Sequence, residues 1–280
     1  MSTHTTQLDH VILLVPYKDL HTPPPWITSN FTLSPGGIHA DAKTENRLIL
    51  FADGTYLELI AFIDDDPAKR KGHWWDKPFG IVDFALTTPK DRTFDLAGLR
   101  ERLKHSGSGV GYAEPVAGGR RREDGLEVQW EVTFPVGAER GEVPFWCHDV
   151  TARERRVAIT EGSTKHPCRA VGMSRVTVEV DPGSVERVGS ALAAITGGSR
   201  RDPDGYAVGN PISAEGQSVD SWVGLRPLDQ GGVGHRLRVT LRLPREAKGG
   251  HDAIKEHVGD VPAKVRAETS TPWSLGEYAA

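Results

Sequence analysis

The sequence predicts an α+β protein built from repeated βαβββ modules, each of which contributes one connection and several strands to a curved sheet. Two observations indicate this fold class. A similar order of apolar runs recurs along the 280 residues, and Gly-rich turn signals separate the runs. A unit with one helix and several strands is longer than a solenoid or propeller repeat, which argues against those classes.

The first unit begins with an apolar, β-branched run at residues 8–15, which ends at Pro16 and predicts a buried strand. Consecutive prolines at 23–25 exclude a regular helix there, so we expect an irregular connection or a segment that starts late, around residues 26–30. Asp53-Gly54 supplies a hairpin turn. Residues 31–38 contain the turn signal Ser34-Pro-Gly-Gly37 and indicate a loop or a ragged strand, and better strands are expected over residues 45–52 and 55–63.

The second unit repeats this order. Residues 80–87 predict a strand, and the spacing of Leu96, Leu99 and Leu103 predicts a helix over residues 94–105. The remaining strands are expected near residue 116 and over residues 126–134 and 143–148.

A third unit follows, with a strand over residues 172–180 and an amphipathic helix over 184–195 that ends at Gly197-Gly198. Its further strands are expected over residues 205–208, 218–225 and 235–243. Residues 252–258 indicate a short helix, and residues 269–280 a poorly anchored tail. We therefore expect two domains, one of paired modules over residues 1–165 and one of a third module with the tail over residues 166–280.

The bulk properties exclude several classes of protein. A net charge of −4 argues against a nucleic-acid partner or an anionic membrane surface, and the apolar runs fall short of the ~20 residues that span a bilayer. Cys147 and Cys168 are too few for a disulfide framework and form no zinc motif. Because the first residues also lack a signal-peptide pattern, we expect a cytoplasmic protein that acts on a small molecule.

Two ionisable side chains, His10 and Glu58, stand inside apolar, strand-like runs. Burying either side chain without a partner costs free energy, and a shared metal ion or substrate would remove that cost. The alternative for His10 is a core histidine that is hydrogen-bonded to a backbone carbonyl. Glu58 lies between Leu57 and Leu59, so it must face either solvent or a site.

Several short motifs surround this pair. Those of the first unit are Leu8-Asp-His-Val11, Gly36-Gly-Ile-His39, Thr44-Glu-Asn46 and Asp53-Gly-Thr-Tyr-Leu-Glu-Leu-Ile60. Weaker ones follow at Gly125-Leu-Glu-Val-Gln-Trp130, Val143-Pro-Phe145 and His166-Pro167. Over roughly the first 170 residues the chain resembles the glyoxalase-like domain family of the vicinal oxygen chelate superfamily, which includes glyoxalases, bleomycin resistance proteins and extradiol dioxygenases. The resemblance implies βαβββ modules paired into a half-open barrel, with the site inside it.

The resemblance also implies a divalent metal bound by side chains from the first and last strands of the modules. Carried over by position, His10 and Glu58 are two ligands, and His148 is the candidate for a third. Imidazole and carboxylate ligands suit Fe, Mn, Ni, Zn or Mg, so the identity of the metal stays open. Phe84 and Arg175 stand where the later modules are expected to repeat His10, which leaves a site without metal as the alternative.

Other residues are candidates for catalysis or substrate binding. Glu58 or His148 is expected to move a proton, although His148 also suits an edge strand. The candidates for substrate binding are His39, Arg121 (with its neighbours in Arg120–Arg122), Trp130 and Trp75. Each has a structural alternative: a solvated loop for His39, a hairpin tip for the arginines, the core for Trp130 and a module junction for Trp75.

These observations lead to a metal-assisted enzyme of lyase or isomerase type that acts on a small oxygenated molecule. A ring-cleaving dioxygenase is the second choice of reaction. The alternative from another class is a metal-free protein that sequesters a small compound, as resistance proteins of the superfamily do. Exposed sheet edges in such modules favour a homodimer.

Overall fold

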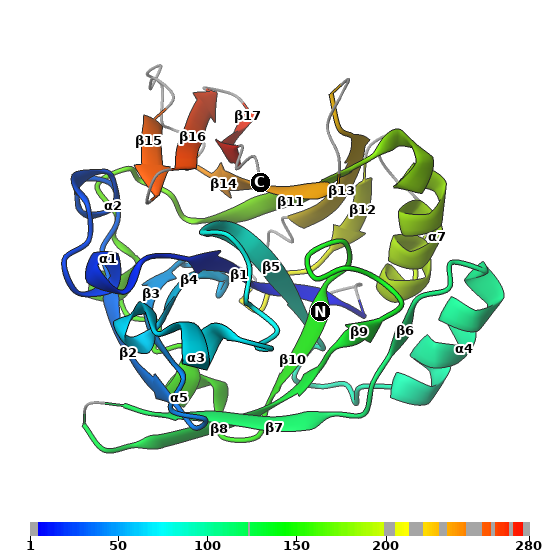
Figure 1. Ribbon diagram of the computed structural model, residues 1–280, viewed down its shortest axis with the longest axis horizontal. Helices are drawn as coiled ribbons and strands as arrows, with labels where there is room; N and C mark the ends of the chain where they lie inside the picture. The colour runs from blue at the N-terminus through cyan, green and yellow to red at the C-terminus, as the bar shows by residue number, and fades with distance from the viewer. Residues whose placement is uncertain are drawn as a thin grey trace.

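The computed structural model describes residues 5–122, 124–198, 205–212, 221–229 and 234–244, and the backbone course of three later strands. Two large sheets dominate the protein: a closed barrel with the strand order β1-β4-β3-β2-β7-β8-β10-β5, and a 7-stranded sheet with the order β12-β13-β11-β14-β17-β16-β15. In Figure 1 the second sheet lies across the top of the barrel, and α4 and α7 stand together at one side. The predicted α+β class with curved, strand-rich sheets is confirmed.

The first module forms half of the barrel. Its elements are β1 (Gln7–Leu14), α1 (Tyr17–His21), α2 (Pro25–Thr28), β2 (Ser34–His39), β3 (Thr44–Leu50) and β4 (Tyr56–Phe62). The irregular connection that we expected is instead two short helices. Pro25 is tolerated because it occupies the first turn of α2, where a backbone N–H has no helical partner.

The second module forms the other half and repeats the pairing of the first. Its elements are β5 (Gly80–Thr87), α4 (Leu96–Ser106), β7 (Val116–Arg121), β8 (Glu127–Thr133) and β10 (Phe145–Asp149), with a small sheet of β6 (Gly111–Tyr112) and β9 (Pro135–Val136). The predicted helix is present as α4, where Asp95 accepts a hydrogen bond from the Gly98 N–H and Gly107 ends the helix at φ 66°.

Two strand pairs join the halves, β1 with β5 and β2 with β7. The second pair closes the barrel, where a half-open one was expected. Gly37 permits this closure, because a Cβ at this position would overlap the Arg121 carbonyl oxygen of β7.

An internal twofold relation connects β1 and β5. The central antiparallel pairs are His10–Ala85, Val11–Phe84 and Ile12–Asp83. The extra residues are Asp9 in β1 and Val82 in β5, which form bulges at equivalent places. Exchanging the two strands therefore maps His10 onto Asp83. The expectation that Phe84 is the equivalent of His10 is therefore wrong by one residue. Phe84 pairs with Val11 at the axis of the twofold relation, so Phe84 is the equivalent of Val11.

The third module starts the second sheet. Its elements are β11 (Gly172–Val180), α7 (Val185–Thr196), β12 (Gly205–Val208), β13 (Ser221–Pro227) and β14 (His235–Arg242). A register shift between Met173 and Arg175 repeats the bulge of β1. Arg175 thus holds the position that corresponds to His10, as the sequence predicts.

The C-terminal part continues this sheet as β15 (Ile254–Val258), β16 (Val261–Glu268) and β17 (Thr271–Gly276). The expected short helix at 252–258 and the expected loose tail at 269–280 are therefore wrong over these strands. β17 pairs with β14, so backbone groups of the sheet gain partners that a tail would not supply. Within the described residues, the protein has no helix of the length and hydropathy that crossing a membrane requires.

Candidate functional site

A β-bulge in β1 brings two neighbouring polar residues to the same side of the strand. Asp9 is fully buried and His10 is 3% exposed. Asp9 Oδ2 lies 2.6 Å from His10 Nδ1, so Nδ1 donates a hydrogen bond to the carboxylate and Nε2 is the ring nitrogen that faces Glu58. Metal-binding imidazoles are commonly oriented in this way by a carboxylate.

Glu58 of β4 places its carboxylate between two imidazoles. Its Oε2 lies 3.6 Å from His10 Nε2, and its Oε1 lies 3.5 Å from His39 Nε2. Asn46 Nδ2 also donates a hydrogen bond of 2.7 Å to Oε1. Burial raises the pKa of this carboxyl group, but the contacts with His39, His10 and Asn46 outweigh burial and lower the pKa to about 2. Glu58 is therefore ionised near neutral pH.

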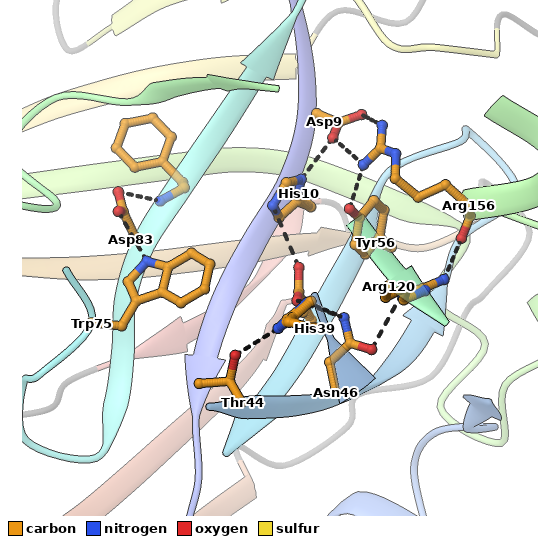
Figure 2. Close-up of polar contacts among 12 residues, drawn as sticks. Asp9, His10, His39, Thr44, Asn46, Tyr56, Trp75, Asp83, Arg120 and Arg156 are labelled. Atoms are coloured by element: carbon orange, nitrogen blue, oxygen red, sulfur yellow. Dashed lines mark hydrogen bonds and ion pairs between the residues drawn. The ribbon is translucent and has the colours of Figure 1, made fainter. Parts of the chain in front are cut away.

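Polar contacts fix the orientation of His39 and Asn46 (Figure 2). His39 Nδ1 lies 2.6 Å from Thr44 Oγ1, and Asn46 Nδ2 lies 3.2 Å from His39 Nε2. Arg120 Nη1 donates to Asn46 Oδ1 over 3.3 Å, which turns the Asn46 amide nitrogen toward Glu58 and His39. The second module thus supports the first through Arg120.

Arg156 of α5 (Arg153–Arg156) holds Asp9, and through it His10. Its guanidinium donates to Asp9 Oδ2 over 2.9 Å, to the Tyr56 hydroxyl, and to Asp149. Tyr56 in turn stacks on the His10 ring at a centroid distance of 4.6 Å. Burial opposes the charge on Asp9, but Arg153 and Arg156 outweigh it and hold the pKa of Asp9 well below its usual value.

The structure does not bring His148 together with His10 and Glu58. In β10, Cys147 packs in the apolar cluster with Phe145, whereas His148 stacks on Trp146 and lies 3.0 Å from Thr88 Oγ1. Burial lowers the pKa of His148 to about 4. His148 is therefore neutral near pH 7 and outside the cluster of His10.

Some of the predicted substrate-binding residues reach the interior of the barrel, and others lie at the surface. Arg121 is exposed, whereas its neighbour Arg120 is buried at 5% exposure. Trp130 approaches the His39 ring edge-on, with centroids 5.9 Å apart. Trp75 packs in an apolar cluster of the barrel, and its Nε1 donates a hydrogen bond to Asp83 (Figure 2). Of these candidates, His39, Trp130 and Trp75 reach the interior.

The two halves of the barrel differ in chemistry. Ile12 pairs with Glu58 in the first module, and Ala85 pairs with Phe145 in the second. Because the twofold relation maps Ile12 onto Ala85, Phe145 is the counterpart of Glu58. The second half thus holds Asp83 and Phe145 where the first half holds His10 and Glu58.

The ligand atoms of a metal site must lie close to one another. Among the described residues, Asp9, His10 and Cys147 are the one group of three whose ligand atoms all lie within 4.8 Å of one another. This group suits a metal poorly, because arginines occupy the Asp9 carboxylate and burial raises the pKa of the Cys147 thiol.

A better donor set is His10 Nε2, His39 Nε2 and the Glu58 carboxylate. Two atoms bound to one ion at about 2.1 Å lie at most about 4.2 Å apart, and each of these imidazoles approaches one oxygen of the carboxylate more closely than that. The three ligand atoms together do not meet the 4.8 Å separation of the first group, so one ion would have to draw the two imidazoles together. His10 Nε2 faces an ionised carboxylate, and a cation bound by both groups would satisfy them. Two imidazoles and one carboxylate suit Fe, Mn, Ni or Zn, so the chemistry of the residues fits a divalent ion.

Comparison with known proteins gives three findings. The glyoxalase-like domain family matches residues 8–196, and no curated protein matches the chain. A hypothetical protein from Staphylococcus aureus aligns with a TM-score of 0.59 and 13% identity, over 92% of this chain and 97% of that one.

Two further solved structures are more distant. Methylmalonyl-CoA epimerase from Mycobacterium tuberculosis aligns with a TM-score of 0.29 and 20% identity, over 47% of this chain and 82% of that one. A xylose isomerase-like TIM barrel/4-hydroxyphenylpyruvate dioxygenase fusion protein aligns with a TM-score of 0.47 and 9% identity, over 86% of this chain and 37% of that one. At these identities the likeness to the staphylococcal protein extends to the fold alone.

Proposed function

This chain belongs to the glyoxalase-like domain family, and we propose that it is a metal-assisted enzyme of lyase or isomerase type that acts on a small oxygenated molecule. One observation carries the proposal. The Glu58 carboxylate lies between the Nε2 atoms of His10 and His39, and both imidazoles are held at Nδ1, by Asp9 and Thr44.

In this proposal His10, His39 and Glu58 hold a divalent ion, which supplies Lewis acidity that stabilises negative charge on a substrate oxygen. Asp9 fixes the tautomer of His10, and Arg156 fixes Asp9. Tyr56 and Phe145 pack against the His10 ring and exclude water from it.

Glu58 is the group that moves a proton. Its Oε1 is held by Asn46, so Oε2 is the oxygen that accepts the proton. After burial, the causes that set its low pKa include a hydrogen bond from His39 and the positive charges of His10 and His39. This low pKa keeps Glu58 ionised near neutral pH, so its carboxylate is in the form that accepts a proton.

Metal analysis tests the proposal. Protein purified without chelators or metal-affinity columns is expected to hold about one divalent ion per chain, as measured by plasma mass spectrometry. The His10→Ala, Glu58→Ala double variant should lose the ion, whereas His105→Ala on the exposed face of α4 should keep it. If the wild-type protein holds no metal and binds none on titration with Zn²⁺, Mn²⁺, Ni²⁺ and Fe²⁺, the proposal is wrong.

A metal-free binding protein is the second candidate. It is favoured by Asp83 and Phe145, which replace potential ligands in the second half, and by the apolar cluster that contains Trp75 and Phe145. The same metal analysis separates the two classes. A ring-cleaving dioxygenase remains the second reaction, since non-haem Fe(II) oxygenases use two imidazoles and one carboxylate; bound iron and oxygen uptake would identify it.

A further inference from the structure

Arg140, between β9 and β10, carries a guanidinium group with unused hydrogen-bond donors. Its side chain is 15% exposed. Its Nε, Nη1 and Nη2 atoms are buried, and none has a hydrogen-bond partner within the described part of the chain. A guanidinium presents five N–H donors in a planar fork, and leaving such donors buried without acceptors costs free energy. A further acceptor beside the guanidinium would therefore be stabilising.

Asp83 balances the charge of Arg140 through one of its three nitrogen atoms, Nη2. Asp83 Oδ2 lies 2.8 Å from Arg140 Nη2, and this is the one ion pair of Arg140 among the described residues. The same carboxylate accepts hydrogen bonds from the Phe84 N–H over 3.0 Å and from Trp75 Nε1 over 3.3 Å. Asp83 thus accepts hydrogen bonds from two groups other than Arg140. Arg140 Nε and Nη1 remain available to another anion.

The surroundings of Arg140 are aromatic. Its Cζ lies 4.0 Å from the centre of the Phe134 ring and 5.6 Å from that of Phe145. Trp75, Phe134 and Phe145 pack in one apolar cluster, and Trp74, which is 40% exposed, packs on Phe134 at the surface. A planar or apolar ligand body suits this environment.

Phe145 connects this place with the proposed metal site. Its ring meets the His10 ring edge-on, with centroids 5.4 Å apart, and it also faces the Arg140 guanidinium. Figure 2 shows Asp83 on the strand next to the one that carries His10, with the Trp75 indole directed toward the Asp83 carboxylate. A small molecule held by Arg140 would therefore have its other end near His10.

From these contacts we propose that Arg140 binds the anionic group of the substrate, and that the substrate is a small monocarboxylate with an apolar or aromatic body. The inference rests on the proposed function in taking the barrel interior as the substrate site. The planar fork suits a carboxylate, and the neighbouring Asp83 charge disfavours a dianion such as a phosphate monoester. Arg120 is a weaker choice, because its two Nη atoms already donate to Asn46 and to the Arg156 carbonyl.

A pair of matched probes tests the proposal: phenylacetate and its neutral amide, phenylacetamide. Each is titrated into protein freed of metal with EDTA, so that a carboxylate cannot bind to a metal ion, and affinity is measured by calorimetry. Wild-type protein is expected to bind phenylacetate at least about tenfold more tightly than the amide, the usual scale of a charge-assisted hydrogen bond. Phenyl phosphate is expected to bind more weakly than phenylacetate.

Variants assign the preference to Arg140. The double variant Asp83→Asn, Arg140→Gln removes both charges together, so that no buried charge is left unpaired, and it should bind the two probes equally. Arg140→Lys keeps the charge without the fork and should retain the preference at lower affinity. Arg92→Gln, at an exposed arginine, should behave as wild type. Thermal melting confirms that each variant is folded.

Three results would overturn the inference: a wild-type protein that binds both probes equally, one that binds neither, or a double variant that keeps the preference. If the double variant does not fold, Arg140→Lys serves as the test. A lower affinity for phenylacetate supports the inference, and an unchanged affinity contradicts it. Failure of this inference is distinct from failure of the proposed function. A protein without metal that still prefers phenylacetate contradicts the metal site alone, and a metal-containing protein without the preference contradicts the role of Arg140 alone.

Discussion

Asp83 of β5 occupies the position that the internal twofold relation between β1 and β5 assigns to His10 of β1. Both side chains are buried, and each has a polar partner: His10 is hydrogen-bonded to Asp9, and Asp83 forms an ion pair with Arg140. The two halves of the barrel therefore share a backbone arrangement and differ in chemistry. The first half offers ligands for a cation, and the second offers donors for an anion.

Replacing Arg156 by Met should destabilise the protein by about 3–5 kcal/mol, because Asp9 would be left buried with one fewer positive partner. Urea denaturation measures this change in the free energy of unfolding. Arg155→Met, at the exposed neighbour, should change it by less than about 0.5 kcal/mol. Equal effects of the two substitutions would show that Arg156 does not stabilise the buried cluster.

Glu58 predicts a specific dependence of stability on pH. Its pKa is about 2 in the folded protein and about 4.3 in an unfolded chain, so its charge stabilises the fold above the unfolded value. This contribution, roughly 3 kcal/mol for a shift of this size, should be lost as pH falls from about 5 toward 2. Urea denaturation across this range should give a shallower slope for Glu58→Gln than for wild type; identical slopes would contradict the prediction.

His39 and His148 should differ in their effect on metal binding. His39→Ala should weaken the affinity for Zn²⁺ at least about tenfold, since His39 Nε2 faces the Glu58 carboxylate. His148→Ala should leave the affinity within about twofold, because the ring packs against Phe94 and Trp146 instead. Competition with a chromogenic chelator measures both affinities. The reverse order would restore His148 as the third ligand.

Gly36 should be intolerant of any side chain. A Cβ at this position would overlap the backbone oxygen and the side-chain Oδ1 of Asn46, and Asn46 holds Glu58 and His39. Gly36→Ala should therefore cost about 1–3 kcal/mol in the free energy of unfolding and weaken metal binding. Gly162→Ala in α6 (Glu161–Thr164), where the nearest atom lies 4.0 Å away, should be neutral or stabilising by up to ~1 kcal/mol.

Local patterns in the sequence were enough to predict the fold class and most elements. The apolar runs of β1, β4, β5 and β11, and the periodic leucines of α4, appear where they were expected. The prediction failed near the C-terminus, where a helix was expected and β15 forms. Strand formation there depends on pairing with β16, which a local pattern does not contain.

The candidate site was predicted in part. His10, Glu58 and His39 were singled out, and the structure places them around one carboxylate. Asp9 and Asn46 were quoted within motifs but given no role. Asp9 could have been found, because two adjacent polar residues in a buried strand violate the alternation of faces and therefore indicate a bulge.

The sequence by itself determined the modules, the family to which the chain belongs, and the two polar residues inside apolar strands, because these follow from short-range periodicity and motif spacing. The tertiary structure decided which residues meet. Arg156 contacts Asp9 across 147 positions of the chain, and the bulges in β1 and β5 make Asp83 the symmetry-equivalent of His10. A shift of register by one residue turns every side chain to the other face. Register depends on contacts between distant strands, which is why the partners of His10 and the place of His148 could be learned only from the folded protein.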